Sequence, residues 1–467
     1  MDVNEVLKFA DEIVFNNTGK HLDDLEQSIL RGVWQGHKYS KIAEESHRTE
    51  SHVRDVASEL WKLLSDKLGE DLTKSNFRAT IERWRFSIVS SNYSKNFVEI
   101  NNVKVCGEAL QSPKVPQDRS HDVRNPVSPR NRVSVDNAPD VSSFYGRAEE
   151  LNILKKWIVE ERCRLVAIVG ISGIGKTALA VKLLERIQDK FEYVIWQSLR
   201  YSPSLEAILR NLIQFLSDRS ETDLPVSIAD RLSLLMEYLR KSRCLIILDD
   251  VQMVLSSGQL AGNYKSGYED YGEFFRTVAE FSHNSCLVMN SWEPPREILP
   301  LKGDTAPIRS LQLNGLGLAA VEILREQGLV EEDKWEYLID AYAGNPLWLK
   351  IVATMIQELF RGKVSEFLKY DTLVLNEDLK AILHQQFNRL SELEKQVISR
   401  IGNESVPVSI YQLLENMQLS PSELFNGIQS LGRRSLIEKK EQSNETLFAV
   451  QPVVRQYVKT QYAGNDG

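Results

Sequence analysis

Apolar residues recur at helical spacing in two stretches near the start of the chain. The first stretch carries Leu22, Leu25, Ile29, Leu30 and Val33, and the second carries Val53, Val56, Leu60, Leu63 and Leu64. Such spacing places apolar side chains on one face of a helix. A short apolar pair, Ile42 and Ala43, lies between the two stretches, and Thr49 is suited to cap the second helix. This order of helices predicts a helix-turn-helix, with residues 49–64 in the place of its recognition helix.

A different pattern follows further along, where short continuous apolar runs alternate with amphipathic stretches. The runs cover residues 164–170, 193–199, 244–251, 286–291 and 308–313. Strands of a parallel sheet that are buried on both faces read as continuous apolar runs. The helical stretches between them therefore predict a doubly wound α/β domain. An amphipathic helix over residues 144–158 precedes the first run.

The stretch between these two regions lacks apolar periodicity. Five of the fifteen prolines fall within residues 106–142, at Pro113, Pro116, Pro126, Pro129 and Pro139. Proline removes a backbone donor and favours extended conformations, so this composition predicts a disordered linker.

Charge narrows the functions of the N-terminal region. The 467-residue chain has 57 Lys and Arg against 65 Asp and Glu, a formal net charge of −8, which excludes a generally basic nucleic-acid-coating protein. Residues 1–95 carry 14 basic and 16 acidic residues. Because phosphate neutralisation supplies most non-specific DNA affinity, we favour a protein-interaction or signalling module here. DNA binding stays open as the alternative.

Several features bear on location. No stretch approaches about 18 consecutive apolar residues, so no transmembrane helix is expected. The first residues are acidic and mixed, unlike a secretory signal. The four cysteines never form a C-x-x-C pair, which disfavours a disulfide scaffold or a zinc site. A cytoplasmic protein is the expectation.

A phosphate-binding motif follows the first apolar run. Residues Gly170–Thr177 read GISGIGKT and match G-x-x-x-x-G-K-[ST] at every defined position. Glycines let the backbone wrap phosphate oxygens with its N–H groups pointing inward. Lys176 is expected to pair with the β- and γ-phosphates and Thr177 to supply a hydroxyl to Mg²⁺. The helix that follows directs its positive N-terminal end at the anion.

A second signal is the run CLIILDDV, residues 244–251, which ends in two carboxylates. Asp249 is expected to hold Mg²⁺, and Asp250 to orient or deprotonate an attacking water. An apolar run that ends in Asp-Asp is weak evidence alone, but the preceding phosphate loop makes it strong.

The surroundings of these motifs resemble the NB-ARC branch of the STAND NTPases. FYGRAEEL, residues 144–151, stands where that family has an aromatic-Gly-Arg-Glu motif, and GNPLWLKIV, residues 344–352, resembles its Gly-x-Pro-Leu motif. Residues 378–460 look like the family's winged helix. The helix-turn-helix, similar to the tetrahelical domains of response regulators and sigma factors, and the insertion 256–275 resemble cyanobacterial members.

The resemblance implies a domain order. We expect a helix-turn-helix-like domain over 1–105, the linker over 106–142, a P-loop domain over 143–313, a helical domain over 314–376, a winged helix over 377–460 and a tail over 461–467. Family members normally continue into a sensory repeat array, and no internal repeat with a period of about 20–50 residues occurs here. A switch without its usual sensor is therefore expected.

The resemblance also implies a mechanism, in which bound ADP holds a closed inactive state and exchange for ATP opens the protein for assembly. Carried over by motif, the residues that bind ADP or ATP are Tyr145, Gly146, Arg147, Gly170, Gly173, Ile174, Gly175, Lys176, Thr177, Ala178, Pro346 and Gln451. Thr177 and Asp249 would bind Mg²⁺, and Asp250 and Lys176 would serve any hydrolysis.

Two departures weaken the expectation of turnover. The family often ends its fourth strand in Thr-Ser-Arg, whereas this chain has Asn290, Ser291 and Trp292. A tryptophan lacks the guanidinium that neutralises phosphate charge. Where many members have Met-His-Asp, this chain has Val450, Gln451 and Pro452. Nucleotide binding stays expected, with slow hydrolysis at most.

The functional hypotheses are therefore ordered. An ADP/ATP-binding signalling switch that associates with itself or a protein partner leads, and a DNA-binding regulator under nucleotide control is the alternative. A metabolic kinase or ordinary motor ATPase is disfavoured because no acceptor-substrate domain is visible. A basic cluster near the expected wing, Arg433, Arg434, Lys439 and Lys440, is interpreted as solvated surface.

Overall fold

The computed structural model describes residues 21–34, 37–46, 48–68, 132–135, 137–217, 224–301, 307–370, 373–442 and 445–462, with single residues near positions 6–14 and 73–77. It divides into two compact units, Met1–Pro126 and Val127–Gly467. Most of the expected linker, including Pro113 to Pro129, lies outside the described residues. No helix within the described ranges is long and apolar enough to cross a bilayer.

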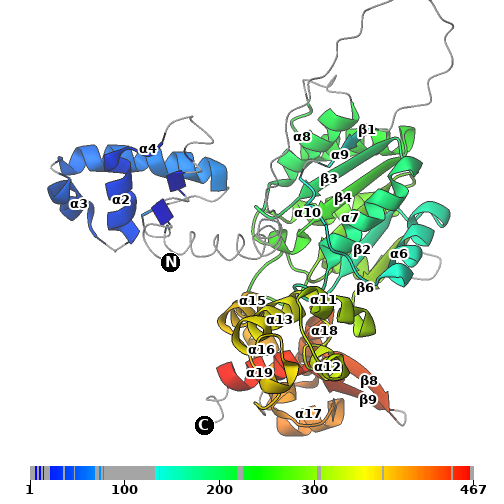
Figure 1. Cartoon of the computed structure of the whole chain (residues 1–467). Helices are drawn as coiled ribbons and strands as arrows, with labels where there is room; N and C mark the ends of the chain where they lie inside the picture. The colour runs from blue at the N-terminus through cyan, green and yellow to red at the C-terminus, as the bar shows by residue number, and fades with distance from the viewer. Residues whose placement is uncertain are drawn as a thin grey trace, which may run out of the picture. The chain divides into compact units, whose positions relative to one another are not determined.

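The N-terminal unit has the predicted helix order. It contains α2 (Asp24–Trp34), α3 (Tyr39–Glu45) and α4 (Glu50–Leu68) (Figure 1). The predicted apolar faces pack into one core that includes Ile29, Ile42 and Val53. The His52 N–H donates to Thr49 Oγ1 over 3.3 Å, so Thr49 caps α4 as predicted. The small all-helical domain is confirmed.

The second unit is built on a parallel sheet of six strands. Their bounds are β1 Arg132–Ser134, β2 Leu165–Val169, β3 Tyr193–Ser198, β4 Cys244–Asp249, β5 Cys286–Ser291 and β6 Ile308–Gln312. The order across the sheet is β1-β3-β4-β5-β2-β6. All five predicted apolar runs form strands, and β5 lies between the phosphate-loop strand β2 and the Asp249 strand β4.

Helices cover both faces of this sheet, which confirms the doubly wound fold (Figure 1). Alternate strand residues fall into two separate cores, with Val166 and Ile247 in one and Ala167 and Ile246 in the other. The first core includes α6 (Ala148–Lys155) and α7 (Lys176–Ile187), and the second includes α8 (Leu205–Leu216), α9 (Ile228–Lys241) and α10 (Asp270–Glu280).

Strand β1 differs from the sequence expectation. Residues 132–134 fall in the range expected to be a disordered linker, yet they pair in parallel with Tyr193, Val194 and Ile195 of β3. A strand of three residues is too short to show an apolar pattern in the sequence. It forms because it hydrogen-bonds to the edge of β3, which is distant in the chain.

The rest of the second unit is mainly helical and continues the first core without a break. Its helices are α11 Val321–Glu326, α12 Trp335–Ala341, α13 Pro346–Phe360, α14 Val364–Phe367, α15 Glu377–Phe387, α16 Glu392–Asn403, α17 Ile410–Asn416, α18 Pro421–Arg433 and α19 Pro452–Tyr462. A small antiparallel sheet has the order β7-β9-β8, with bounds Val408–Ser409, Glu445–Ala449 and Glu438–Gln442. Ser391, Ser409 and Ser420 each begin a helix with a capping box.

Candidate nucleotide-binding site

The predicted phosphate loop lies between β2 and α7, in the strand–loop–helix setting that the motif requires. Gly173 and Gly175 adopt left-handed conformations, with φ of 78° and 99°. Such values suit glycine because it lacks a Cβ. Ile174 is buried under the loop, and Ala178 lies in the first turn of α7. The loop can therefore present backbone N–H groups to an anion at the start of a helix.

Lys176 is folded against the loop. Its Nζ donates to the carbonyl oxygens of Gly170 over 2.8 Å and Ile171 over 3.1 Å. Burial lowers the pKa of this amine to about 8, while Asp250 and Asp249 act in the opposite direction. A buried amine that donates to two carbonyl oxygens is placed to exchange these contacts for phosphate oxygens, as expected for its role.

Asp249 ends β4 among oxygen and amide groups. Its Oδ1 accepts from Thr177 Oγ1 over 3.1 Å and from Asn290 Nδ2 over 3.0 Å. Burial and the neighbouring Asp250 raise the pKa of Asp249 to about 7, against the effect of these hydrogen bonds. A carboxylate beside a hydroxyl is the oxygen donor set that Mg²⁺ prefers, so the two predicted metal ligands lie together.

Asp250 is restrained by contacts with residues on two other segments. Its backbone is left-handed, with φ of 59°. Arg200 Nε lies 3.7 Å from one carboxylate oxygen, and Gln252 Nε2 donates to the other over 2.8 Å. Arg200 follows β3, the strand beside β4. Since Arg200 lies 50 residues away in the chain, no local pattern pointed to it.

Arg147 joins three segments at the loop. Its guanidinium donates to the Ile174 carbonyl over 3.1 Å, the Asn314 carbonyl over 2.6 Å and the Glu150 carboxylate over 2.8 Å. The side chain is buried and its φ is 65°. Its donors thus bind protein oxygens, so Arg147 supports the phosphate loop through the backbone.

The two residues before Arg147 lie beside the helical part. The Tyr145 hydroxyl donates to Glu326 Oε2 of α11 over 2.5 Å. Gly146 has φ of 63°, and a Cβ there would meet Ala319 at 2.9 Å. The segment expected to bind the nucleotide therefore also contacts Ala319 and Glu326 of the helical part.

The start of α13 contacts the phosphate loop directly. Pro346 is the first residue of the helix, and Asn345 caps it by accepting from the N–H groups of Leu347 and Trp348. Asn345 Nδ2 donates to the Ser172 carbonyl over 3.0 Å, and the Leu347 N–H donates to the Gly173 carbonyl over 3.3 Å. Asn345 was missed, although an Asn before a Pro at a helix start is a recognisable cap.

Gln451 has no contact with the loop among the hydrogen bonds of the described residues. Its carbonyl accepts from the Arg455 N–H at the start of α19, and its buried Oε1 has no partner there. Trp292 is also directed elsewhere, because the Arg389 guanidinium lies 5.9 Å from the centre of its ring.

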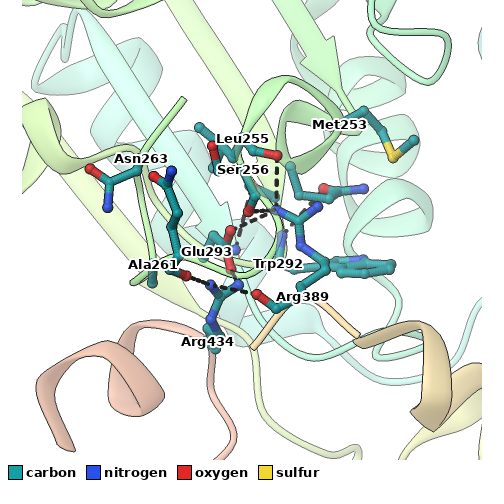
Figure 2. Close-up of polar contacts among 12 residues, drawn as sticks. Met253, Leu255, Ser256, Ala261, Asn263, Trp292, Glu293, Arg389 and Arg434 are labelled. Carbon is teal, nitrogen blue, oxygen red and sulfur yellow. Dashed lines mark hydrogen bonds and ion pairs between the residues drawn. The ribbon is translucent and has the colours of Figure 1, made fainter. Parts of the chain in front are cut away.

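One expectation is wrong. Arg434 is not solvated surface, because its side chain is 4% exposed and pairs with Glu293 (Figure 2). It also pairs with Glu394. The partners lie 141 and 40 residues away, too far for a charge pattern to indicate them.

Helix α4 offers little charge to DNA. In its N-terminal half the basic residue Arg54 is accompanied by Glu50, Asp55 and Glu59. Arg54 pairs with Glu50, one helical turn away, at 2.5 Å. The face predicted for recognition is thus internally neutralised, in line with the preference for a protein-interaction module.

Together, the parallel sheet and the phosphate loop define a P-loop NTPase fold. Residues 147–258 match the NB-ARC domain, and residues 1–84 match the vWA-MoxR associated protein N-terminal HTH. The chain therefore carries an NB-ARC domain and an N-terminal helix-turn-helix domain of that type.

Relatives share these domains over part of their length. An uncharacterized WD repeat-containing protein of Nostoc sp. is 44% identical over 336 residues, which cover 69% of this chain and 26% of that protein. Disease resistance RPP13-like protein 4 of Arabidopsis thaliana is 30% identical over 138 residues, which cover 27% of this chain and 16% of that protein. The chain thus spans about a quarter or less of either relative.

Among solved structures, a STAND protein with a tetratricopeptide repeat sensor from Pyrococcus horikoshii is similar. It has 20% identity and a TM-score of 0.36, and the match covers 70% of this chain and 44% of that one.

Proposed function

We propose that this protein is an ADP/ATP-binding signalling switch. In the closed state ADP would occupy the phosphate loop, and exchange for ATP would open the protein or allow it to assemble with copies of itself or a protein partner. The observation that carries this proposal is the double attachment of the phosphate loop. Asn345 and Leu347 bind it from α13, and Arg147 binds it from the segment before α6.

This attachment couples occupancy to domain arrangement. A nucleotide that alters the loop must alter its contacts with α13, because both elements share hydrogen bonds. A ligand shifts such an equilibrium only through unequal affinity for the two states. The contacts at Ser172 and Gly173 supply that difference, since they exist only while α13 lies against the loop.

The residues proposed to hold the nucleotide divide by role. The loop from Gly170 to Ala178 would bind the phosphates, Tyr145 to Arg147 and Pro346 would border the adenosine, and Gln451 would approach the β-phosphate. Thr177 and Asp249 would hold Mg²⁺, which supplies charge neutralisation at the phosphates when bound.

Slow hydrolysis follows from how the acidic residues are held. Asp250 is occupied by Arg200 and Gln252. Trp292 stands where related chains place an arginine and packs beside Arg389. A carboxylate that accepts a hydrogen bond from Gln252 and lies 3.7 Å from a guanidinium is a poor acceptor for a proton from water, so binding dominates over turnover in this proposal.

The proposed function also gives a role to each of the other domains. We propose that residues 314–376 form the helical domain and that residues 377–460, with their three-stranded sheet, form a winged helix that packs within the protein. The helix-turn-helix domain would bind protein, and DNA binding remains the alternative. A salt titration of DNA affinity separates the two, because phosphate contacts give a steep dependence on salt.

A nucleotide titration tests the switch. We expect the full chain to bind ADP and ATP, and the Lys176→Ala variant to lose most of that affinity. Lys176→Ala is the matched control because it removes one amine from the site. Failure of the wild-type chain to bind either nucleotide at millimolar concentration would refute the proposal.

A further inference from the structure

Four charged side chains are buried together where the sheet meets the C-terminal helices. Glu293 follows β5, Arg389 lies between α15 and α16, Glu394 lies in α16, and Arg434 follows α18. Their exposed fractions are 1%, 7%, 0% and 4%. Charged residues are seldom buried this far unless they are paired.

Each of the four charges has an oppositely charged partner, and the pairing crosses between two parts of the unit. Arg389 Nη2 donates to Glu293 Oε1 over 2.8 Å, and Arg434 Nη1 donates to Glu293 Oε2 (Figure 2). Arg434 Nε donates to Glu394 Oε1 over 2.8 Å. Glu293 thus accepts from two arginines of the C-terminal part, and the four formal charges cancel.

The insertion after β4 supplies the rest of this contact. Backbone carbonyls of Leu255 and Ser256 accept from Arg389, and the Gln259 carbonyl accepts from Arg434 over 2.8 Å. In return, the Gly258 N–H donates to the Arg389 carbonyl over 3.0 Å and the Ala261 N–H donates to Ser430 Oγ over 2.6 Å. These five residues lie in the segment 255–261.

The two parts of the nucleotide-binding domain that make this contact both begin close to the nucleotide site. The segment 255–261 is separated from Asp250 only by the short helix η3 (Val251–Val254), and Glu293 lies three residues after Asn290. Asp249 and Asn290 are themselves joined by a hydrogen bond of 3.0 Å. A shift of β4 or β5 at the phosphates is therefore carried within a few residues to Glu293 and the insertion.

A buried cluster of ion pairs adds little net stability, so the two parts that it joins can separate. The attraction within a buried ion pair is largely offset by the cost of removing the charges from water, whereas loss of one partner leaves an uncompensated buried charge. The closed arrangement is thus favoured only while all four residues are in place. On separation, each charge regains water, so opening has no large residual penalty.

We propose that Glu293, Arg389, Arg434 and Glu394 form an autoinhibitory latch that holds the C-terminal part against the nucleotide-binding domain, and that nucleotide exchange releases it. This proposal rests on the proposed function, because the released state is the open state of the switch. It also assigns a role to the insertion, whose backbone forms hydrogen bonds with the two arginines of the latch.

Hydrogen exchange of the full chain with ADP tests the latch. The amides of Gly258 and Ala261 donate across the contact, so a peptide over residues 255–263 reports its opening. We expect Glu293→Gln to speed exchange of these amides about 100-fold, because one removed partner leaves a net buried charge. Exchange in β2 should stay unchanged, which shows that the domain remains folded.

Two further variants keep the test specific. Glu293→Gln with Arg389→Gln leaves the directly paired Arg434 and Glu394, so exchange should slow again relative to Glu293→Gln. Glu297→Gln removes a buried carboxylate whose hydrogen bonds come from Tyr264 and Arg296, on the same side of the contact. This control should leave Gly258 and Ala261 at least about tenfold slower than Glu293→Gln does.

The outcomes separate the two proposals. Equal exchange in Glu293→Gln and Glu297→Gln, or faster exchange in the double variant than in Glu293→Gln, would overturn the latch. Binding of ADP is measured on the same wild-type sample. Absence of ADP binding would overturn the proposed function. Normal ADP binding, with no faster exchange of segment 255–263 in Glu293→Gln, would overturn the latch alone.

Discussion

Gly173 is the position where the phosphate loop and α13 approach most closely, and its replacement isolates their coupling. A Cβ at Gly173 would lie 2.6 Å from Leu347 Cβ and 3.0 Å from Asn345 Oδ1. A Cβ at Gly175 would meet nothing within 4 Å, although both glycines have positive φ. Gly173→Ala and Gly175→Ala therefore share the backbone strain and differ in the clash.

The magnitude follows from this difference. An alanine in the left-handed region costs about 1–2 kcal/mol in either variant. Overpacking at Gly173 adds about 1–3 kcal/mol, because Leu347 Cβ belongs to the start of a helix and has little room to move. We therefore expect the contact with α13 to be weaker by about 2 kcal/mol in Gly173→Ala than in Gly175→Ala, or roughly 30-fold in the local opening equilibrium.

Hydrogen exchange without nucleotide is the suitable assay, since nucleotide bound at the loop would add its own effect to the exchange rates of both variants. The Leu347 amide donates to the Gly173 carbonyl, so a peptide over residues 344–352 reports separation of α13 from the loop. Equal exchange of this peptide in the two variants would refute the coupling. Faster exchange in Gly173→Ala alone supports it.

Three further predictions concern the charged groups of the site. Because burial and Asp250 raise the pKa of Asp249 to about 7, protonation competes with metal binding below that pH. Calorimetry should show Mg²⁺-dependent nucleotide affinity falling about tenfold per pH unit below 7. A flat profile would contradict the role of Asp249 as a metal ligand. Arg200→Ala should raise ATP turnover by a few-fold without changing ADP affinity, because Asp250 loses its guanidinium partner; phosphate-release kinetics check this, and unchanged turnover would argue against restraint of Asp250. Arg147→Lys should speed ADP release about 10- to 100-fold, since one amine cannot replace a guanidinium that binds two carbonyls and a carboxylate. ADP release at the wild-type rate in a stopped-flow measurement would contradict the support of the phosphate loop by Arg147.

Much of the fold was predictable because its signals are local. Continuous apolar runs identified five strands, and the phosphate loop could be recognised from one octapeptide, Gly170–Thr177. Thr49 was recognisable as a cap for the same reason. Each of these features depends on residues that are neighbours in the sequence.

The remaining features depend on distant partners. Arg434 has the local sequence of a surface arginine, and only the folded chain brings it to Glu293, 141 residues earlier. Arg200 reaches Asp250 because β3 lies beside β4 in the sheet. Asn345 combines both cases, since its capping role was readable and its bond to the Ser172 carbonyl was not.

In the proposed switch, the identity of the bound nucleotide sets the state of this chain. Native mass spectrometry of the full chain in ADP and in ATP measures bound nucleotide and the number of copies together. We expect ADP retained on a single copy, larger assemblies after exchange for ATP, and neither effect in Lys176→Ala. The same number of copies in ADP and in ATP, with both nucleotides bound, would contradict nucleotide-gated assembly, and no bound nucleotide in either sample would contradict the account as a whole.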